Sequence, residues 1–401
     1  MAKSLRRSRT VAVALVTFAT FTDIVAYSVA VPVLPDLSRK LGASPTMIGL
    51  LFASFGVTLL TVSIPMGAVS DRSGRKGPMV GGLFALAAST LLFAYSNGLP
   101  WLFAARLVQG AADAVTWVVG FALIADRYGP EERGRVSGIV MSGTSAAVMV
   151  GPTIGGWLYE AGGIRAPFLL VAGLAALAAV LFLWLEIPSE HTETEQVPIR
   201  VVLRSQSVAI GAAVVVVVSG TISMLEPVLP LFLTAKLGLG PARIGLIFGS
   251  GAVASAILHP IYGHMADWWG GKRLMTIGLL LVAAALPLLS VSWNYPSTIV
   301  FFVLNTMAMA LVITPSLTFM AEAVSDAGVG SFGVGYGLYN MAWGAGLMGG
   351  PAIAGFVFER AGFARLTLAW LPLLIVVTVL LARVQSGRGV RFQADLRGVR
   401  P

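Results

Sequence analysis

The sequence predicts an all-α membrane protein with twelve transmembrane helices in two pseudo-symmetric six-helix bundles. Three observations carry this prediction: the composition, the spacing of the apolar runs and an internal repeat. Of the 401 residues, 57% are hydrophobic and only 11% are charged, whereas soluble proteins carry about 25% charged residues. This balance is typical of an integral membrane protein.

Apolar runs of about 20 residues, the length that spans a bilayer as a helix, recur along the whole chain. The single long polar break is residues 189–206. We therefore expect an N-terminal six-helix bundle (1–188), a cytoplasmic linker (189–206), a C-terminal six-helix bundle (207–383) and a cytoplasmic tail (384–401). The twelve runs are 11–34, 46–69, 78–97, 100–125, 134–160, 165–187, 207–234, 241–267, 274–292, 297–321, 333–358 and 364–383.

The first apolar run follows a basic N-terminal segment, as a secretory signal peptide would. However, the run contains Asp23, ends in Pro32 and Pro35, and shows no small-residue cleavage site. We therefore interpret it as a retained transmembrane helix.

The distribution of lysine and arginine predicts the orientation. With a cytoplasmic N-terminus, 19 of the 27 Lys and Arg residues fall on cytoplasmic segments and seven fall on external loops. Positive residues concentrate on the cytoplasmic side of membrane proteins. Both termini are thus expected in the cytoplasm, and the net charge of +9 reflects orientation and not nucleic-acid binding.

The two halves of the chain repeat each other. Residues 31–52 match 226–248 with one insertion, 67–76 match 263–272 at an offset of 196, and 151–163 match 350–362 at an offset of 199. Internal duplication in a polytopic chain is typical of a transporter whose two halves rock against each other.

The sequence offers little for enzyme chemistry. Cysteine is absent, so disulfide and thiol chemistry are excluded. No Ser-His-Asp arrangement, metal-ligand cluster or phosphate-binding loop is recognisable, and the glycine-rich stretch 328–337 follows no strand. We expect no enzyme activity, no metal and no cofactor.

Charges inside the apolar runs are few. Asp23, Asp113 and Glu226 are the acids well inside them, and Arg106 is the one basic residue there. A charge at the bilayer centre costs about 2.5–3.5 kcal/mol on insertion scales, so such groups face a cavity or a partner. Asp23 and Asp113 are both expected near the membrane midplane, and Glu226 further out.

Three of these charges have an alternative interpretation. Arg106 and Asp113 lie seven residues apart, nearly on one helix face, and either form a structural ion pair or leave Arg106 free to reach an acid on the first helix. Glu226, which aligns with Val31 in the repeat, is either a functional acid or a solvated residue near the external mouth.

Aromatic and amide side chains lie at suitable places for an amine-binding cage, because a cation over an aromatic face gains about 0.5–2 kcal/mol. Helix packing is an equally good explanation for each aromatic residue taken alone. His259, beside Pro260, is a further candidate for proton transfer or for a structural role. The candidate substrate-binding residues, besides Asp23 and Glu226, are Tyr27, Trp117, Asn305, Tyr339, Asn340 and Trp343.

Glycines and prolines predict hinges and tight helix packing. Gly151 and Gly155 are spaced for close helix approach, and Pro152 can bend the same helix. We expect these residues to act in gating and not as ligands.

Several motifs resemble the major facilitator superfamily over essentially the whole chain. The stretch Gly67-x-x-x-Asp71-Arg72-x-Gly74-Arg75-Lys76 resembles its loop 2–3 signature, Arg106-x-x-Gln109-Gly110 a second signature, and residues 138–156 the helix-5 signature of antiporters. The resemblance implies that Asp71 and Arg72 hold the two halves together when the cytoplasmic side is closed. It also implies that Arg106, Asp113, Asp23 and Glu226 take part in proton coupling.

Within that superfamily the chain is most similar to drug–proton antiporters and vesicular monoamine transporters, through Asp23 upstream of VPVLP, SMLEPVLP (223–230) and GLLFAS (49–54). In the vesicular family the first-helix aspartate is taken to bind the amine. The chain departs from that family at Phe55, where the family has lysine, and lacks a glycosylation sequon. These departures favour a prokaryotic protein of the cell membrane.

The expected function is proton-coupled antiport of small organic cations such as monoamines or cationic drugs, by alternating access. A carboxylate taken out of water favours its neutral form and can hold either a proton or a cation. We expect a monomer in the bilayer, with the proton as coupling ion. The alternative is a uniporter or proton symporter of a neutral metabolite.

Overall fold

The computed structural model describes residues 2–186, 205–326 and 332–384, and these residues form helices joined by short connections. The α-helices are α1 (Ala2–Ser28), α2 (Leu34–Leu41), α3 (Pro45–Ser73), α4 (Lys76–Tyr95), α5 (Leu99–Arg127), α6 (Pro130–Gly162), α7 (Arg165–Trp184), α9 (Gln206–Leu237), α10 (Pro241–Trp269), α11 (Gly271–Ala285), α12 (Tyr295–Asp326) and α13 (Phe332–Arg383), and the 3-10 helices are η1 (Val31–Val33) and η2 (Leu286–Val291).

The boundaries of the helices follow local chemistry that the repeat duplicates. Gly42 ends α2 at φ 61°, and Gly238 ends α9 at φ 63°. Glycine adopts this left-handed conformation without the penalty that a Cβ brings. Proline opens α3 (Pro45) and α10 (Pro241), because the first helical N–H has no partner within the helix.

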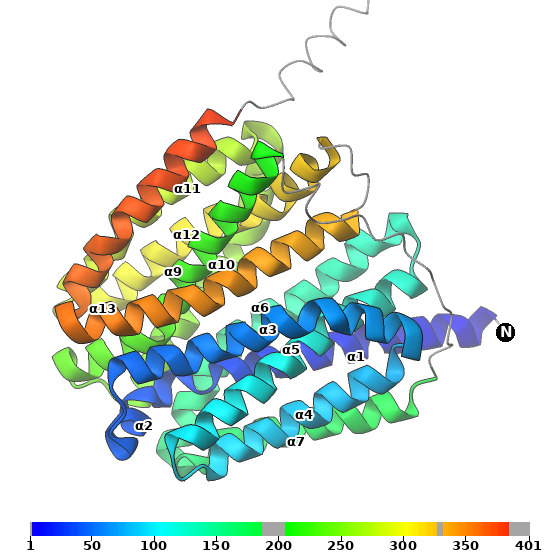
Figure 1. Cartoon of the computed structure of the whole chain (residues 1–401), viewed down its shortest axis with the longest axis horizontal. Helices are drawn as coiled ribbons and strands as arrows, with labels where there is room; N and C mark the ends of the chain where they lie inside the picture. Colours follow the sequence, from blue (N-terminus) through cyan, green and yellow to red (C-terminus); the bar gives the residue numbers. More distant parts are fainter. Residues whose placement is uncertain (1, 187–204, 327–331, 385–401) are drawn as a thin grey trace, which may run out of the picture.

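Eleven helices in the described part of the chain are long and apolar enough to cross a membrane. The last of them, α13, has 52 residues and is interrupted at Gly362, whose φ of 78° and ψ of 171° are not helical. The chain turns back there, so α13 consists of two antiparallel segments (Figure 1).

The two halves form separate bundles, α1–α7 and α9–α13 (Figure 1). Each bundle has its own apolar core. A smaller cluster joins the halves: Tyr27, Phe52 and Phe55 from the first half pack with Phe248 and Leu347 from the second. Duplicated bundles with a modest shared contact agree with the repeat found in the sequence.

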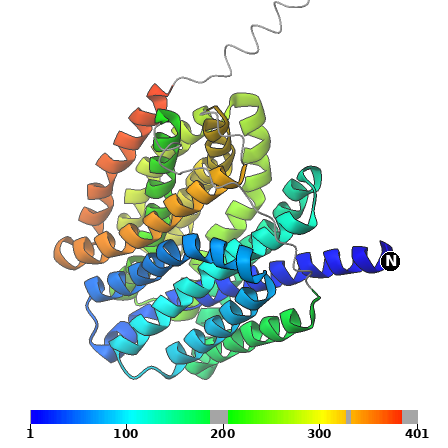
Figure 2. The same ribbon diagram turned by 45° about the vertical axis from the view of Figure 1, so that its right-hand side comes forward.

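Contacts between the halves concentrate at one end of the molecule, which we call the α2 end because it holds α2 and the turn of α13. The opposite end, which holds residues 67–76, is the signature end. The ribbons of α3 and α13 lie close together near the α2 end and diverge toward the signature end (Figures 1 and 2). Among the described residues, the hydrogen bonds between the halves use Tyr27, Thr46, Thr153, Ala242 and their partners, toward the α2 end. The molecule is therefore held closed at the α2 end.

Candidate functional site

Asp23 is deeply buried on α1 and lacks hydrogen-bond partners. Its side chain is 1% exposed, and neither carboxylate oxygen accepts a hydrogen bond from any residue that the structure describes. The polar groups nearest to it are the Asp113 carboxyl group and the Trp117 indole of α5, which lie within interaction range without forming a well-aligned hydrogen bond. A buried polar group without partners costs free energy, so this carboxylate is available for a proton or a cation.

Asp113 is the second acid at this level. It is 5% exposed and interacts with both Asp23 and Trp117. Because two carboxylates at short range disfavour double ionisation, the pair suits a site that exchanges a proton for another cation. The Trp117 ring stacks on Phe121 at 5.6 Å between centroids, which fixes the orientation of its indole.

Arg106 does not pair with Asp113 in the described structure. It is 0% exposed, and its Nη1 donates to Gln109 Oε1 at 2.8 Å and to the Tyr27 carbonyl at 3.3 Å. Its guanidinium lies over the rings of Phe52 (4.3 Å), Tyr27 (5.2 Å) and Phe93 (5.4 Å). The ion pair that the seven-residue spacing allowed is thus absent from the ion pairs of the described residues, and aromatic faces surround the charge instead.

Nε and Nη2 of Arg106 have no hydrogen-bond partner among the described residues. Glu226 is the acid that interacts with this guanidinium across the interface between the halves. The arginine therefore retains donors for a carboxylate that approaches from the other half.

Tyr27 connects the two halves. Its hydroxyl donates to Glu226 Oε2, and its ring packs against Phe55 at 4.7 Å and Phe52 at 5.9 Å. Glu226 lies on α9 and is half-buried, so it is not a fully solvated residue at the mouth. Arg106, Tyr27 and Glu226 form a connected group one helical turn from Asp23.

The candidate residues of the second half do not contact Asp23 in the described structure. Tyr339 bonds to Ser316 at 3.2 Å and stacks on Trp343 at 6.1 Å, and both aromatic side chains pack on a small apolar cluster within their own half. Asn340 is half-buried on the same helix. The aromatic cage is thus not assembled around the acid in this conformation.

Asn305 and His259 both lie between helices of the second half, and in the described part of the chain only His259 has a hydrogen-bond partner for the atom considered. Asn305 is 2% exposed, and its Oδ1 has no partner among the described residues, so it is a free acceptor on α12. His259 Nδ1 lies 2.8 Å from Thr314 Oγ1 and links α10 to α12, an arrangement that accounts for it structurally.

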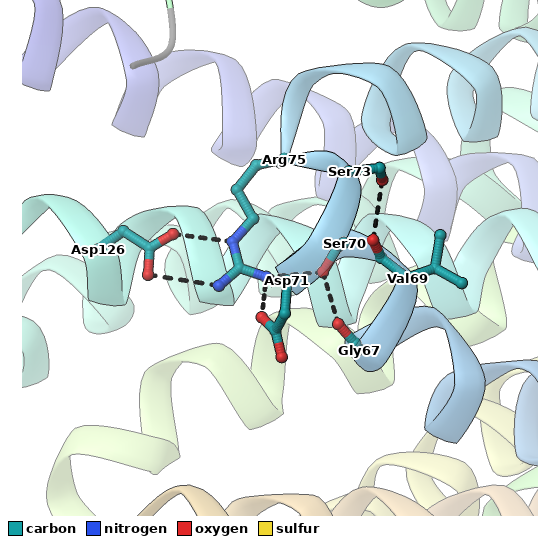
Figure 3. Close-up of polar contacts among 7 residues, drawn as sticks. All are labelled: Gly67, Val69, Ser70, Asp71, Ser73, Arg75 and Asp126. Atoms are coloured by element: carbon teal, nitrogen blue, oxygen red, sulfur yellow. Dashed lines mark hydrogen bonds and ion pairs between the residues drawn. The ribbon is translucent and has the colours of Figure 1, made fainter. Parts of the chain in front are cut away.

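The signature residues form a network within the first half (Figure 3). Arg75 binds Asp71, Ser70 (2.7 Å) and Asp126 (2.8 Å). Burial lowers the pKa of Arg75, but the hydrogen bonds to Asp126 and Asp71 outweigh this and raise it above its ordinary value. The guanidinium therefore stays charged and joins α3 to α5.

The other signature residues play backbone or surface roles in this conformation. Gly74 adopts φ 81°, where a side chain would be strained, Arg72 is exposed, and Gly67 and Lys76 flank the turn. No hydrogen bond or ion pair of the described residues joins this network to the second half, so its role in holding the halves together stays a prediction for another state.

Gly151, Pro152 and Gly155 position α6 between the halves. A Cβ on Gly151 would meet Ser28, and one on Gly155 would meet Val29, so both allow α6 to approach α1. The Pro152 carbonyl faces Gly245 of α10 in the second half. The antiporter-type motif on α6 therefore packs against α1 of its own half and also against α10 of the other half.

Comparison with known proteins decides the family. The model of the Major Facilitator Superfamily matches residues 16–225 and 211–398, which together include most of the chain. The chain belongs to the major facilitator superfamily. It is a multi-pass membrane transporter and not an enzyme, and transporters of this superfamily need no cofactor.

Amine transporters are among the relatives. The human synaptic vesicular amine transporter is 28% identical over 352 residues, which is 87% of this chain and 68% of that protein. The human MFS-type transporter SLC18B1 is 24% identical over 360 residues, 85% of this chain and 78% of that protein. A solved bacterial homologue of the human lysosomal transporter Spinster shares the fold, with a TM-score of 0.77 at 14% identity over 93% of this chain and 96% of that one.

Proposed function

We propose that this member of the superfamily is a proton-coupled antiporter that exports small organic cations, monoamines or cationic drugs, by alternating access. The observation that carries the proposal is Asp23: a carboxylate inside the membrane-spanning bundle, without hydrogen-bond partners among the described residues and next to a second acid. Such a group binds either a proton or an ammonium ion, and that competition couples the two fluxes.

The similarity to vesicular amine transporters supports an amine as substrate. We further propose twelve membrane passes with both termini in the cytoplasm of a cell membrane, and a monomer as the working unit. The α2 end is then external, so the described conformation, held closed at that end by contacts between the halves, is one that is closed to the outside.

The coupling cycle follows from these positions. In the cytoplasm-facing state an amine displaces the proton shared by Asp23 and Asp113, and the loaded protein then closes at the signature end and opens at the α2 end. A proton from outside displaces the amine there. One proton exchanged for one monovalent cation moves no net charge, so the pH gradient alone drives the cycle, and one pH unit is worth about 1.4 kcal/mol, or tenfold in concentration.

Flux in proteoliposomes tests the proposal. With the interior acidic, an antiporter accumulates a labelled monoamine such as serotonin inside, and collapse of the gradient with nigericin releases it. Accumulation of a neutral solute on the alkaline side would instead identify a symporter, and amine fluxes equal to those of empty liposomes would contradict the proposal.

Tyr27→Phe tests the link between the halves. The variant keeps the ring beneath Arg106 and against Phe55 but deletes the hydroxyl that binds Glu226. A hydrogen bond to a charged group contributes about 1.5–3 kcal/mol. Because Tyr27→Phe loses this contribution in the state that is closed at the α2 end, we expect amine exchange to slow by about tenfold or more.

The matched control is Tyr95→Phe, because Tyr95 is exposed and offers its ring to Arg165. It should exchange at the wild-type rate. Wild-type exchange by Tyr27→Phe, measured in the same reconstitution, would show that the hydroxyl does not matter.

A further inference from the structure

Two glutamates at equivalent positions of the repeat lie at the α2 end. Glu160 is on α6 in the first half, and Glu359 is on α13 in the second, at the offset of 199 that relates residues 151–163 to 350–362. Both side chains are exposed, so burial does not explain their placement.

Each glutamate accepts a hydrogen bond from the backbone of the opposite half. Glu160 Oε1 lies 2.9 Å from the N–H of Ala242, the second residue of α10. Glu359 Oε2 lies 2.9 Å from the N–H of Thr46, the second residue of α3. Ala242 and Thr46 are also equivalent in the repeat, so the two contacts are copies of each other.

The two donors, the backbone N–H groups of Thr46 and Ala242, cannot be hydrogen-bonded within their own helices. The first N–H groups of an α-helix have no acceptor within it, and the positive end of the helix dipole favours a carboxylate. The N-cap of α10 is Gly240, which provides no capping side chain, so Glu160 supplies an acceptor from the other half. At the start of α3, the Ser44 hydroxyl accepts a hydrogen bond from the N–H of Met47, and Glu359 accepts one from the N–H of Thr46.

The backbones around both contacts are packed in the same way. A Cβ on Gly156 would meet the carbonyl of Pro241, and a Cβ on Gly355 would meet the carbonyl of Pro45. Each glutamate therefore lies one turn beyond a glycine that lets its helix reach the start of a helix in the other half. Two such crossings, α6 with α10 and α13 with α3, close the α2 end.

We propose that Glu160 and Glu359 are a matched pair of conformational clamps that hold the α2 end closed and are released together when that end opens. The clamps exist only while the halves touch, so their whole contribution favours the closed state, which is what a population shift requires. The proposal rests on alternating access as proposed above, but not on the identity of the substrate or on proton coupling.

Distances between spin labels test the clamps without any transport measurement. Because the chain has no cysteine, Asn97→Cys and Ala364→Cys place one label in each half, on exposed residues near the α2 end. Pulsed electron–electron double resonance in nanodiscs then reports the closed and open populations. The variants are Glu160→Ala, Glu359→Ala and both together, with Asp326→Ala, an exposed acid at the end of α12, as control.

We expect each single variant to raise the ratio of open to closed molecules by about threefold and the double variant by about tenfold, as capping interactions of this kind are modest. Glu→Gln at both sites keeps an acceptor and should give intermediate ratios. A double variant with the same distance distribution as Asp326→Ala would overturn the proposal. If the wild-type protein carries no amine flux while the double variant still shows more open molecules, the antiport function is contradicted and the clamps stand.

Discussion

Asp23→Asn is expected to weaken amine binding strongly and to abolish pH-driven flux. The substitution preserves the size of the side chain and removes only its charge. Truncating one member of a buried charge pair costs about 2–5 kcal/mol, which corresponds to amine affinity weaker by about 30-fold to several thousand-fold. Equilibrium binding of a labelled monoamine in detergent measures this directly.

Stability distinguishes this effect from misfolding. Neither oxygen of Asp23 has a hydrogen-bond partner among the described residues, so removing its charge relieves a desolvation cost. Asp23→Asn should therefore unfold at the wild-type temperature or above it. Asp36→Asn is the control, because Asp36 forms a surface ion pair with Arg39 at 2.9 Å, and it should bind amine normally. Normal amine affinity in Asp23→Asn would refute the site.

Gly49→Val and Gly245→Val are each expected to stop transport by preventing closure of the α2 end. A Cβ on Gly49 would meet the Pro351 carbonyl, and one on Gly245 would meet the Pro152 carbonyl. Both obstructions come from the opposite half, so each bundle can fold around the new side chain. Overpacking costs about 1–3 kcal/mol, which lowers the ratio of closed to open molecules by about 5–150-fold.

Labelling from the α2 end measures this opening. Leu34 is buried in the cluster between the halves, so Leu34→Cys in the cysteine-free chain should react slowly with an impermeant maleimide. Adding either valine should make the reaction fast. Gly81→Val is the matched control, because a Cβ there meets nothing within 4 Å. Undiminished transport by both valine variants would show that the α2 end need not close this tightly.

The sequence predicted the family from its motifs. It predicted the two bundles because composition and run length reflect the bilayer, and because the internal repeat reflects the pseudo-symmetry of the protein. It also predicted the deep acids, since a charge inside an apolar run is costly wherever it lies. The hydrogen bond between Tyr27 and Glu226 was not predictable, because it depends on how the two halves pack against each other. The partners of Arg106 were missed for a similar reason, although the spacing of Gln109 at i+3 was a usable signal.

The glutamate clamps show what a repeat can and cannot reveal. The equivalence of Glu160 and Glu359 is present in the aligned motifs. However, the sequence alone does not indicate a partner for a glutamate near the end of a predicted transmembrane helix. Only the crossing of α6 with α10, and of α13 with α3, brings the opposite helix N-termini within reach. Tyr339 and Trp343 illustrate the converse, because their helical spacing fits a binding cage and packing equally well.

Proton release on amine binding tests the central claim most directly. At a pH where the site is protonated, calorimetry in buffers of different ionisation enthalpy gives the number of protons displaced per amine bound. If Asp23 is where proton and substrate compete, wild type should release about one proton per monovalent amine, and Asp23→Asn should release none at amine concentrations that still give measurable binding. Equal proton release by the two proteins would contradict the account.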